Sequence, residues 1–186
     1  MKSISSDSII IDADYRIDEI FTEKKIPEDI QSSLKLISVK YYSFDGKLHQ
    51  GQILIHKDLA EDIVEIFEII KQNRFPIAKV IPINKYNWSD ELSTSDNNSS
   101  AFNYRFVKGT KKFSAHSFGR AIDINPVQNP HIKINKLNSS KRAYNPDAKG
   151  TITSNSFVVR EFLKRGWKWG GNWKSSKDYQ HFEKLK

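Results

Sequence analysis

The most informative part of the chain is one short stretch, Ser114-Ala-His-Ser-Phe-Gly-Arg-Ala-Ile-Asp-Ile-Asn125. It holds His116 and Asp123, seven residues apart, with Gly119 between them. An odd separation places two side chains on opposite faces of a straight strand. Both can face one point only if the chain bends, and Gly119 can adopt the unusual dihedral angles of a bend. The stretch therefore predicts a turn at Gly119 that brings His116 and Asp123 together.

Beyond this turn the sequence alternates in the manner of a strand. Ala121 and Asp123 would share one face, and Ile122 and Ile124 the other. We therefore expect a strand that buries its isoleucines and presents Asp123 to a site, with the small Ala121 leaving room beside it.

The last segment, Lys177-Asp-Tyr-Gln-His-Phe-Glu183, adds a third candidate ligand in His181 and a carboxylate in Asp178. The chain has no cysteine, so a bound metal must use histidines and carboxylates. Three protein ligands, His116, Asp123 and His181, leave one position open, which is typical of catalytic zinc. Zinc lowers the pKa of bound water from about 15.7 to about 7, so a carboxylate such as Asp178 can take its proton near neutral pH.

Together these segments resemble peptidase family M15, the zinc D-Ala-D-Ala carboxypeptidases, which includes VanX- and VanY-like enzymes and L-alanyl-D-glutamate endopeptidases. The family signature is Ser-x-His-x-x-Gly-x-Ala-x-Asp, followed later by an acidic residue three positions before a histidine. The resemblance covers roughly residues 36–186. The matching residues are Ser114, His116, Gly119, Ala121, Asp123, Asp178 and His181.

The resemblance implies a role for each of these side chains. One zinc ion per chain would be held by His116, Asp123 and His181, and Asp178 would act as the catalytic base. An aspartate at this position is more similar to the endopeptidase branch, so D,D-specificity does not follow. Arg105 sits where the family has an arginine that contacts the substrate carbonyl or carboxylate.

The chemistry of the individual residues agrees with these roles. A guanidinium such as that of Arg105 can donate two parallel hydrogen bonds and stabilise a developing oxyanion. Ser114 is expected to orient the site or the substrate, and Glu183 is a candidate acceptor for an imidazole N–H. His49, His56 and His131 are expected to be surface or hydrogen-bonded residues. Trp167, Trp169 and Trp173 are interpreted as closing a core or cleft, with a sugar-stacking platform as the alternative.

Length and composition indicate one compact domain. The chain has 186 residues, 38% of them hydrophobic. We assign residues 1–35 to an N-terminal arm or lead-in and residues 36–186 to the catalytic domain. The mixture of strands, helices and loops without a regular βαβ rhythm predicts an α+β fold. The resemblance implies a hedgehog/DD-peptidase-like domain, whose central antiparallel sheet carries the zinc site between flanking helices.

Several elements follow from local patterns. Strands are predicted over 36–42 and 48–55, joined at Asp45-Gly46. A helix is predicted after an N-cap at Asp58, and a second helix after an N-cap at Ser156. Residues 77–83 indicate another strand, shortened by Pro82. Residues 84–100 and 126–153 are interpreted as long loops of functional importance. The predicted apolar face of the first helix consists of Leu59, Ile63, Ile66, Phe67 and Ile70.

The net charge is +8, from 30 basic and 22 acidic residues, but the basic residues are dispersed. A nucleic-acid-binding domain would cluster them, so we expect no nucleic acid partner. The expected partners are peptidoglycan stem peptides, with the bond left open between D-Ala-D-Ala, L-Ala-D-Glu and others. The alternative is a non-catalytic, zinc-stabilised cell-wall-binding module, against which the intact Asp178 argues. We expect a monomer without a membrane span, acting in the periplasm or cell wall, with its leader absent from this sequence.

Overall fold

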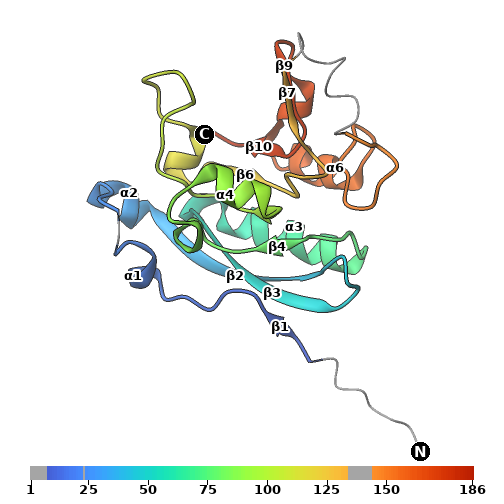
Figure 1. Ribbon diagram of the computed structural model, residues 1–186, viewed down its shortest axis with the longest axis horizontal. Helices are drawn as coiled ribbons and strands as arrows, with labels where there is room; N and C mark the ends of the chain where they lie inside the picture. Colours follow the sequence, from blue (N-terminus) through green and yellow to red (C-terminus); the bar gives the residue numbers. More distant parts are fainter. Residues whose placement is uncertain (1–7, 23, 134–143) are drawn as a thin grey trace, which may run out of the picture.

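The computed structural model describes residues 8–22, 24–133 and 144–186 (Figure 1). Its longest strands are β2 (Leu34–Tyr42) and β3 (Leu48–His56), which form an antiparallel hairpin. A short strand, β1 (Ile10–Ile11), pairs in parallel with β3, so the sheet order is β1-β3-β2. The hairpin predicted at Asp45-Gly46 is confirmed, because the turn backbone at Gly46 has φ +78° and the Asp45 carboxylate accepts the Lys47 N–H.

A second sheet carries the candidate site. It has the order β6-β10-β8, formed by β6 (Ala121–Asp123), β10 (His181–Glu183) and β8 (Lys168–Trp169), and all its pairings are antiparallel. Two further pairs form separate two-stranded sheets: β4 (Lys79–Val80) runs parallel to β5 (Asn98–Ser99), and β7 (His131–Lys133) runs antiparallel to β9 (Ser176–Asp178).

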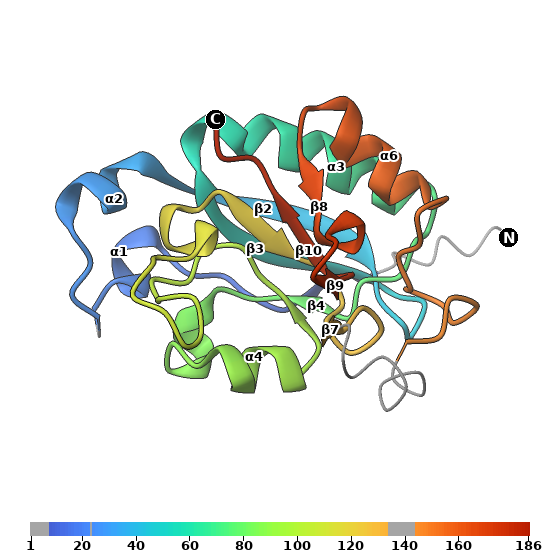
Figure 2. The same ribbon diagram turned by 90° about the horizontal axis from the view of Figure 1, so that it is seen from above.

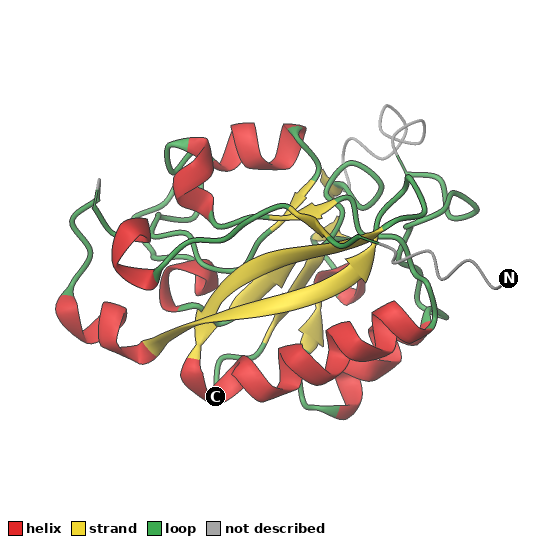
Figure 3. Cartoon of the chain, turned by 90° about the horizontal axis from the view of Figure 1, so that it is seen from below, coloured by secondary structure: helices red, strands yellow, loops and turns green. Residues whose placement is uncertain are grey.

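Helices lie on both sides of the strands (Figures 2 and 3). On one side are α3 (Ala60–Gln72) and α6 (Phe157–Lys164), and on the other are α1 (Ile17–Ile20) and α4 (Asp90–Ser95). A further helix, α2 (Glu28–Ser33), leads directly into β2. The architecture is mixed α and β, consistent with the predicted α+β class. The specific hedgehog/DD-peptidase-like fold stays a prediction.

The helix predicted after Asp58 is present but begins differently. A 3₁₀ turn, η1 (Lys57–Leu59), precedes α3, and the imidazole of His56, not the Asp58 side chain, accepts a backbone N–H there. The Asp58 carboxylate instead forms an ion pair with Arg120 at 3.2 Å. The predicted apolar face is confirmed, because all five of its residues are buried in the main core. The predicted cap of α6 by Ser156 is also confirmed.

The strand predicted over 77–83 is shorter than expected, because only Lys79 and Val80 pair with β5. Beyond them, the side chain of Asn98 replaces the strand's backbone hydrogen bonds: its Oδ1 accepts the Ile81 N–H, and its Nδ2 donates to the Ile81 carbonyl. The polar stretch 84–100 is not simply a loop, since it contains α4, β5 and part of the 3₁₀ turn η2 (Ile83–Tyr86). Of the loop predicted over 126–153, residues 134–143 lie outside the described part, and β7 occupies 131–133.

The described residues before β2 pack against the body of the protein. Ile20, Ile26 and Ile30 form a second apolar cluster with Leu54 and other side chains. The division of the chain at residue 35 stays a prediction. Among the described residues, no helix has the length and apolar character that a membrane crossing requires.

Candidate metal centre

Strand pairing places two of the three candidate ligands opposite each other. In the antiparallel pair of β6 and β10, Asp123 is the register partner of His181. Ile122 and Phe182 are also register partners, and both belong to the main core. The alternation predicted for this strand is therefore present, with Asp123 on the face that also carries His181.

His116 reaches the same point from a turn and not from a strand. It lies in the 3₁₀ turn η3 (Ala115–Phe118), where the Ser114 hydroxyl accepts the His116 N–H at 3.4 Å. The turn ends at Gly119, with φ +61°. A Cβ atom there would lie 2.6 Å from the backbone nitrogen of His56, so both the dihedral angle and the close approach require glycine.

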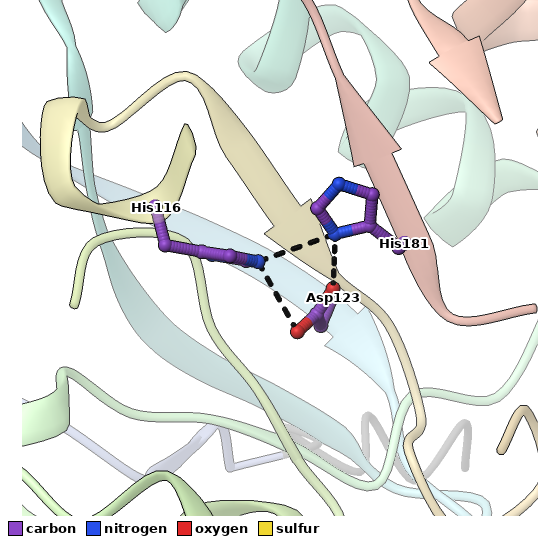
Figure 4. Close-up of side chains that lie close together, drawn as sticks. All are labelled: His116, Asp123 and His181. Atoms are coloured by element: carbon purple, nitrogen blue, oxygen red, sulfur yellow. Dashed lines mark hydrogen bonds and ion pairs between the residues drawn. The ribbon is translucent and has the colours of Figure 1, made fainter. Parts of the chain in front are cut away.

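The three side chains point toward one another (Figure 4). His116 Nε2 lies 3.2 Å from His181 Nδ1 and 3.3 Å from Asp123 Oδ2, and His181 Nδ1 lies 3.0 Å from Asp123 Oδ1. Tetrahedral zinc with bonds of about 2.0 to 2.1 Å holds its ligand atoms about 3.3 Å apart. The two nitrogens are close to this separation, and each lies next to a different oxygen of the Asp123 carboxylate. One ligand atom from each of the three buried residues lies within 4.8 Å of the others, so the group could hold a zinc ion. We call these three residues the metal centre.

The remaining nitrogen of each imidazole has its own acceptor. His116 Nδ1 faces the Ala101 carbonyl oxygen at 2.5 Å, and His181 Nε2 lies 3.4 Å from Glu183 Oε2. Donation at these positions leaves His116 Nε2 and His181 Nδ1 available for a metal. Glu183 thus lies where the sequence predicted an imidazole acceptor.

The electrostatics of the metal-free centre reflect the same convergence. Burial alone would raise the pKa of Asp123, but the charges and hydrogen bonds of His116 and His181 outweigh it and hold this pKa far below its usual range. Burial lowers the pKa of His181, yet hydrogen bonds to Asp123 and Glu183 raise it to about 10. Without a metal, His181 is therefore a cation paired with the Asp123 carboxylate.

Asp178 lies beside the metal centre at the end of β9. Its side chain is buried, and its Oδ1 has no hydrogen-bond partner among the described residues. Burial and the negative charge of Asp123 raise the pKa of Asp178 to about 6. The backbone of Asp178 packs closely against Gly170: a Cβ atom on residue 170 would lie 2.6 Å from the Asp178 carbonyl oxygen. The neighbouring His131 comes within 3.9 Å of this carboxylate.

A cleft of about 390 Å³ joins the metal centre to Asp178, Arg105 and Ser114, all of which line it. Trp173 also lines the cleft, with its ring centroid 5.2 Å from that of His181, whereas Trp167 and Trp169 are buried in the core. The structure thus brings together every residue assigned a site role from the sequence. Trp173 lines the cleft, as one of its two interpretations from the sequence allowed, and the structure adds His131, which was expected to be a surface or hydrogen-bonded residue, and Asp90, for which sequence spacing carried no signal.

Comparison with protein-family models matches residues 108–184 to a family described as D-alanyl-D-alanine carboxypeptidase. The matched segment contains the metal centre, Ser114 and Asp178, whereas Arg105 lies just before it. No curated protein and no solved structure matches the chain.

Proposed function

We propose, from the match of residues 108–184 to a model of peptidase family M15, that the protein is a zinc-dependent peptidase that hydrolyses peptide bonds in peptidoglycan stem peptides. The observation that carries the proposal is the convergence of two buried imidazole nitrogens, 3.2 Å apart, on the Asp123 carboxylate, in the wall of a cleft that Asp178 also lines. A bound zinc ion would supply Lewis-acid activation of the scissile carbonyl and of water.

The reaction would use Asp178 to move the proton. As a carboxylate it can accept a proton from the attacking water and deliver that proton to the leaving amine. A pKa of about 6 suits both steps, because the group is mostly ionised at neutral pH and still holds a proton well enough to donate it. The Oδ1 atom without a partner among the described residues is free to make these contacts.

Arg105 would bind the substrate from the cleft wall. Its guanidinium can donate paired hydrogen bonds to a carboxylate or to the oxyanion that develops during hydrolysis. Ser114 would contribute less directly, because its hydroxyl already caps the turn that carries His116. Its proposed role is to orient that turn and the substrate segment next to it.

The test is mass spectrometry of purified peptidoglycan fragments incubated with zinc-loaded protein. Asp178→Asn is the matched control, because it removes the base and keeps nearly the same shape. We expect the variant to retain zinc and to lose about 10²- to 10⁴-fold in kcat, the usual contribution of general-base catalysis. The masses of the products identify the bond that is cut.

The alternative, a non-catalytic zinc-stabilised wall-binding module, predicts a different result. Fragments would then remain intact with fully zinc-loaded wild-type protein, and peptidoglycan binding would not depend on Asp178. That outcome would contradict the peptidase proposal.

A further inference from the structure

The backbone of Arg105 is tied to the turn that carries His116. The Arg105 N–H donates to Ser117 Oγ at 2.9 Å, and Ser117 Oγ donates back to the Arg105 carbonyl at 2.7 Å. The Ser114 N–H donates to the same carbonyl at 3.1 Å. These bonds place the Cα of Arg105 relative to the metal centre, but they do not determine where its long side chain points.

The far end of the side chain is held from another element. Arg105 Nη2 lies 3.0 Å from Asp90 Oδ1, and Asn103 Nδ2 lies 3.5 Å from the same oxygen. Asp90 is the first residue of α4 and lines the same cleft. Its position is itself well determined, because Ser89 Oγ caps α4 and Ser93 Oγ accepts from the Asn98 side chain of β5.

Arg105 needs such a partner because of its other neighbours. Lys24 lies close enough that burial, together with the charge of Arg105, lowers the pKa of the Lys24 ammonium. Two cations repel each other, and the Asp90 carboxylate paired with Arg105 offsets this repulsion at the guanidinium. The Nε of Arg105 is buried and has no hydrogen-bond partner within the described ranges. One donor is thus left unused while the Nη2 end is occupied.

We infer that Asp90 is a positioning residue, which orients the Arg105 guanidinium so that its remaining donors face the substrate in the cleft. This inference rests on the proposed function, in which Arg105 contacts the substrate. Asp90 acts through Arg105 and needs no contact with the reacting atoms. An ion pair without this task would have only a small effect on stability at such an exposed position.

The first test is kinetic and uses the zinc-loaded full chain with the peptidoglycan fragment it hydrolyses. Asp90→Asn is expected to lower kcat/KM by about 10- to 100-fold, the scale of a misplaced binding group. The loss should fall in the same parameter, kcat or KM, as for Arg105→Lys, and Asp90→Glu should recover most of it. Zinc affinity should not change. The matched control is Asp58→Asn, which breaks the similar ion pair with Arg120, because neither residue lines the cleft.

A double variant separates positioning from independent effects. If Asp90 acts through Arg105, Asp90→Asn should lower kcat/KM by less than about twofold further in the Arg105→Lys background. Multiplicative losses, or an unchanged kcat/KM in Asp90→Asn alone, would overturn the inference. Melting temperatures should differ from wild type by no more than about 3 °C, which excludes misfolding as the cause.

A second test does not depend on activity. The Nε–H resonance of Arg105 in NMR spectra, assigned by its loss in Arg105→Lys, should exchange with solvent faster in Asp90→Asn and at the wild-type rate in Asp58→Asn. Unchanged exchange in Asp90→Asn would overturn the inference. If wild-type protein hydrolyses no fragment, the proposed function fails, and the exchange rate alone decides whether Asp90 positions Arg105.

Discussion

The metal centre and a second cluster of one histidine and two carboxylates, formed by Asp12, Asp45 and His49, have similar residues but different geometry. In the second cluster, His49 Nδ1 lies 2.9 Å from Asp12 Oδ2, and His49 Nε2 lies 3.3 Å from Asp45 Oδ2. The two carboxylates therefore occupy opposite sides of one ring. In the metal centre, each imidazole turns one nitrogen toward a common point and the other toward an acceptor.

A candidate metal site requires ligand atoms that converge on one point, and the presence of histidines and carboxylates is not enough. The imidazole of His49 bridges two carboxylates and has no nitrogen left for a metal. Asp12 also accepts from the Tyr41 hydroxyl, and burial raises the pKa of that phenol far above its usual range. Because Asp12 follows β1 and His49 lies on β3, this cluster fastens the N-terminal strand to the sheet. We call it the tether.

The largest expected effect is on zinc affinity. His116→Ala should weaken zinc binding by more than about 100-fold, because losing a ligand costs more than losing a residue behind one. His49→Ala, in the tether, should leave zinc affinity unchanged. Competition with a chelator of known affinity measures both. Equal losses in the two variants would break the distinction between the clusters.

The affinity of the metal centre for zinc should also depend on pH. With its pKa raised to about 10, His181 is charged in the metal-free protein at neutral pH, and zinc must displace its proton. The affinity for zinc should therefore rise about tenfold per pH unit from pH 6.5 to 8.5, with about one proton released per ion. Calorimetry in buffers of different ionisation enthalpy counts that proton. A flat affinity over this range would mean that the ring is already neutral.

The raised pKa of His181 also determines how the stability of the metal-free protein changes with pH. The pKa of His181 in the folded protein lies above its value of about 6.5 in the unfolded chain. Its pairing with Asp123 therefore contributes its full stabilisation of the folded state below pH 6.5. That stabilisation is lost as the pH rises toward 10. Urea unfolding of the metal-free protein at pH 6.5 and 9 should show this decrease, and His181→Gln should remove it.

The acceptor behind His181 should have a smaller effect than a ligand. Glu183→Ala should weaken zinc binding by about 10- to 100-fold, because the imidazole loses the group that orients it. Glu161→Ala is a suitable control, since that carboxylate pairs with Lys164 and Arg165 away from the cleft. Unchanged affinity in Glu183→Ala would show that the strand pairing of β10 alone orients His181.

The smallest effects belong to the tether and concern stability. His49→Ala should lower the free energy of unfolding by about 1 to 3 kcal/mol, since Asp12, whose side chain is 16% exposed, loses a partner. Asp45→Asn should have a smaller effect, because the Asp45 side chain is 44% exposed and its ion pair is screened by solvent. Denaturant unfolding of the zinc-loaded protein compares the two. A larger loss for Asp45→Asn would contradict the assignment of Asp12 as the main anchor.

Local patterns predicted several elements well and others poorly. The β2 and β3 hairpin, the apolar face of α3 and the cap at Ser156 depend on neighbours within a few residues, and the structure has them all. The strand over 77–83 was predicted too long, because the Asn98 side chain, 17 residues away, satisfies the backbone of Ile81. The predicted loop 84–100 contains α4 for a related reason: Ser89 caps this helix, and Ser93 accepts a hydrogen bond from the Asn98 side chain.

The sequence by itself determined which residue types are available and their local geometry. The turn at Gly119 and the strand that presents Asp123 can be read from short-range spacing, whereas grouping His181 with them depended on the resemblance to a known family. Only the tertiary structure decided which side chains meet: His181 faces Asp123 across 58 residues because β6 and β10 pair in one register. The ion pair between Asp90 and Arg105 depends likewise on packing between separate elements. Short-range sterics and hydrogen bonding act along the chain, whereas burial of apolar surface selects among distant pairings, and a local pattern does not encode that choice.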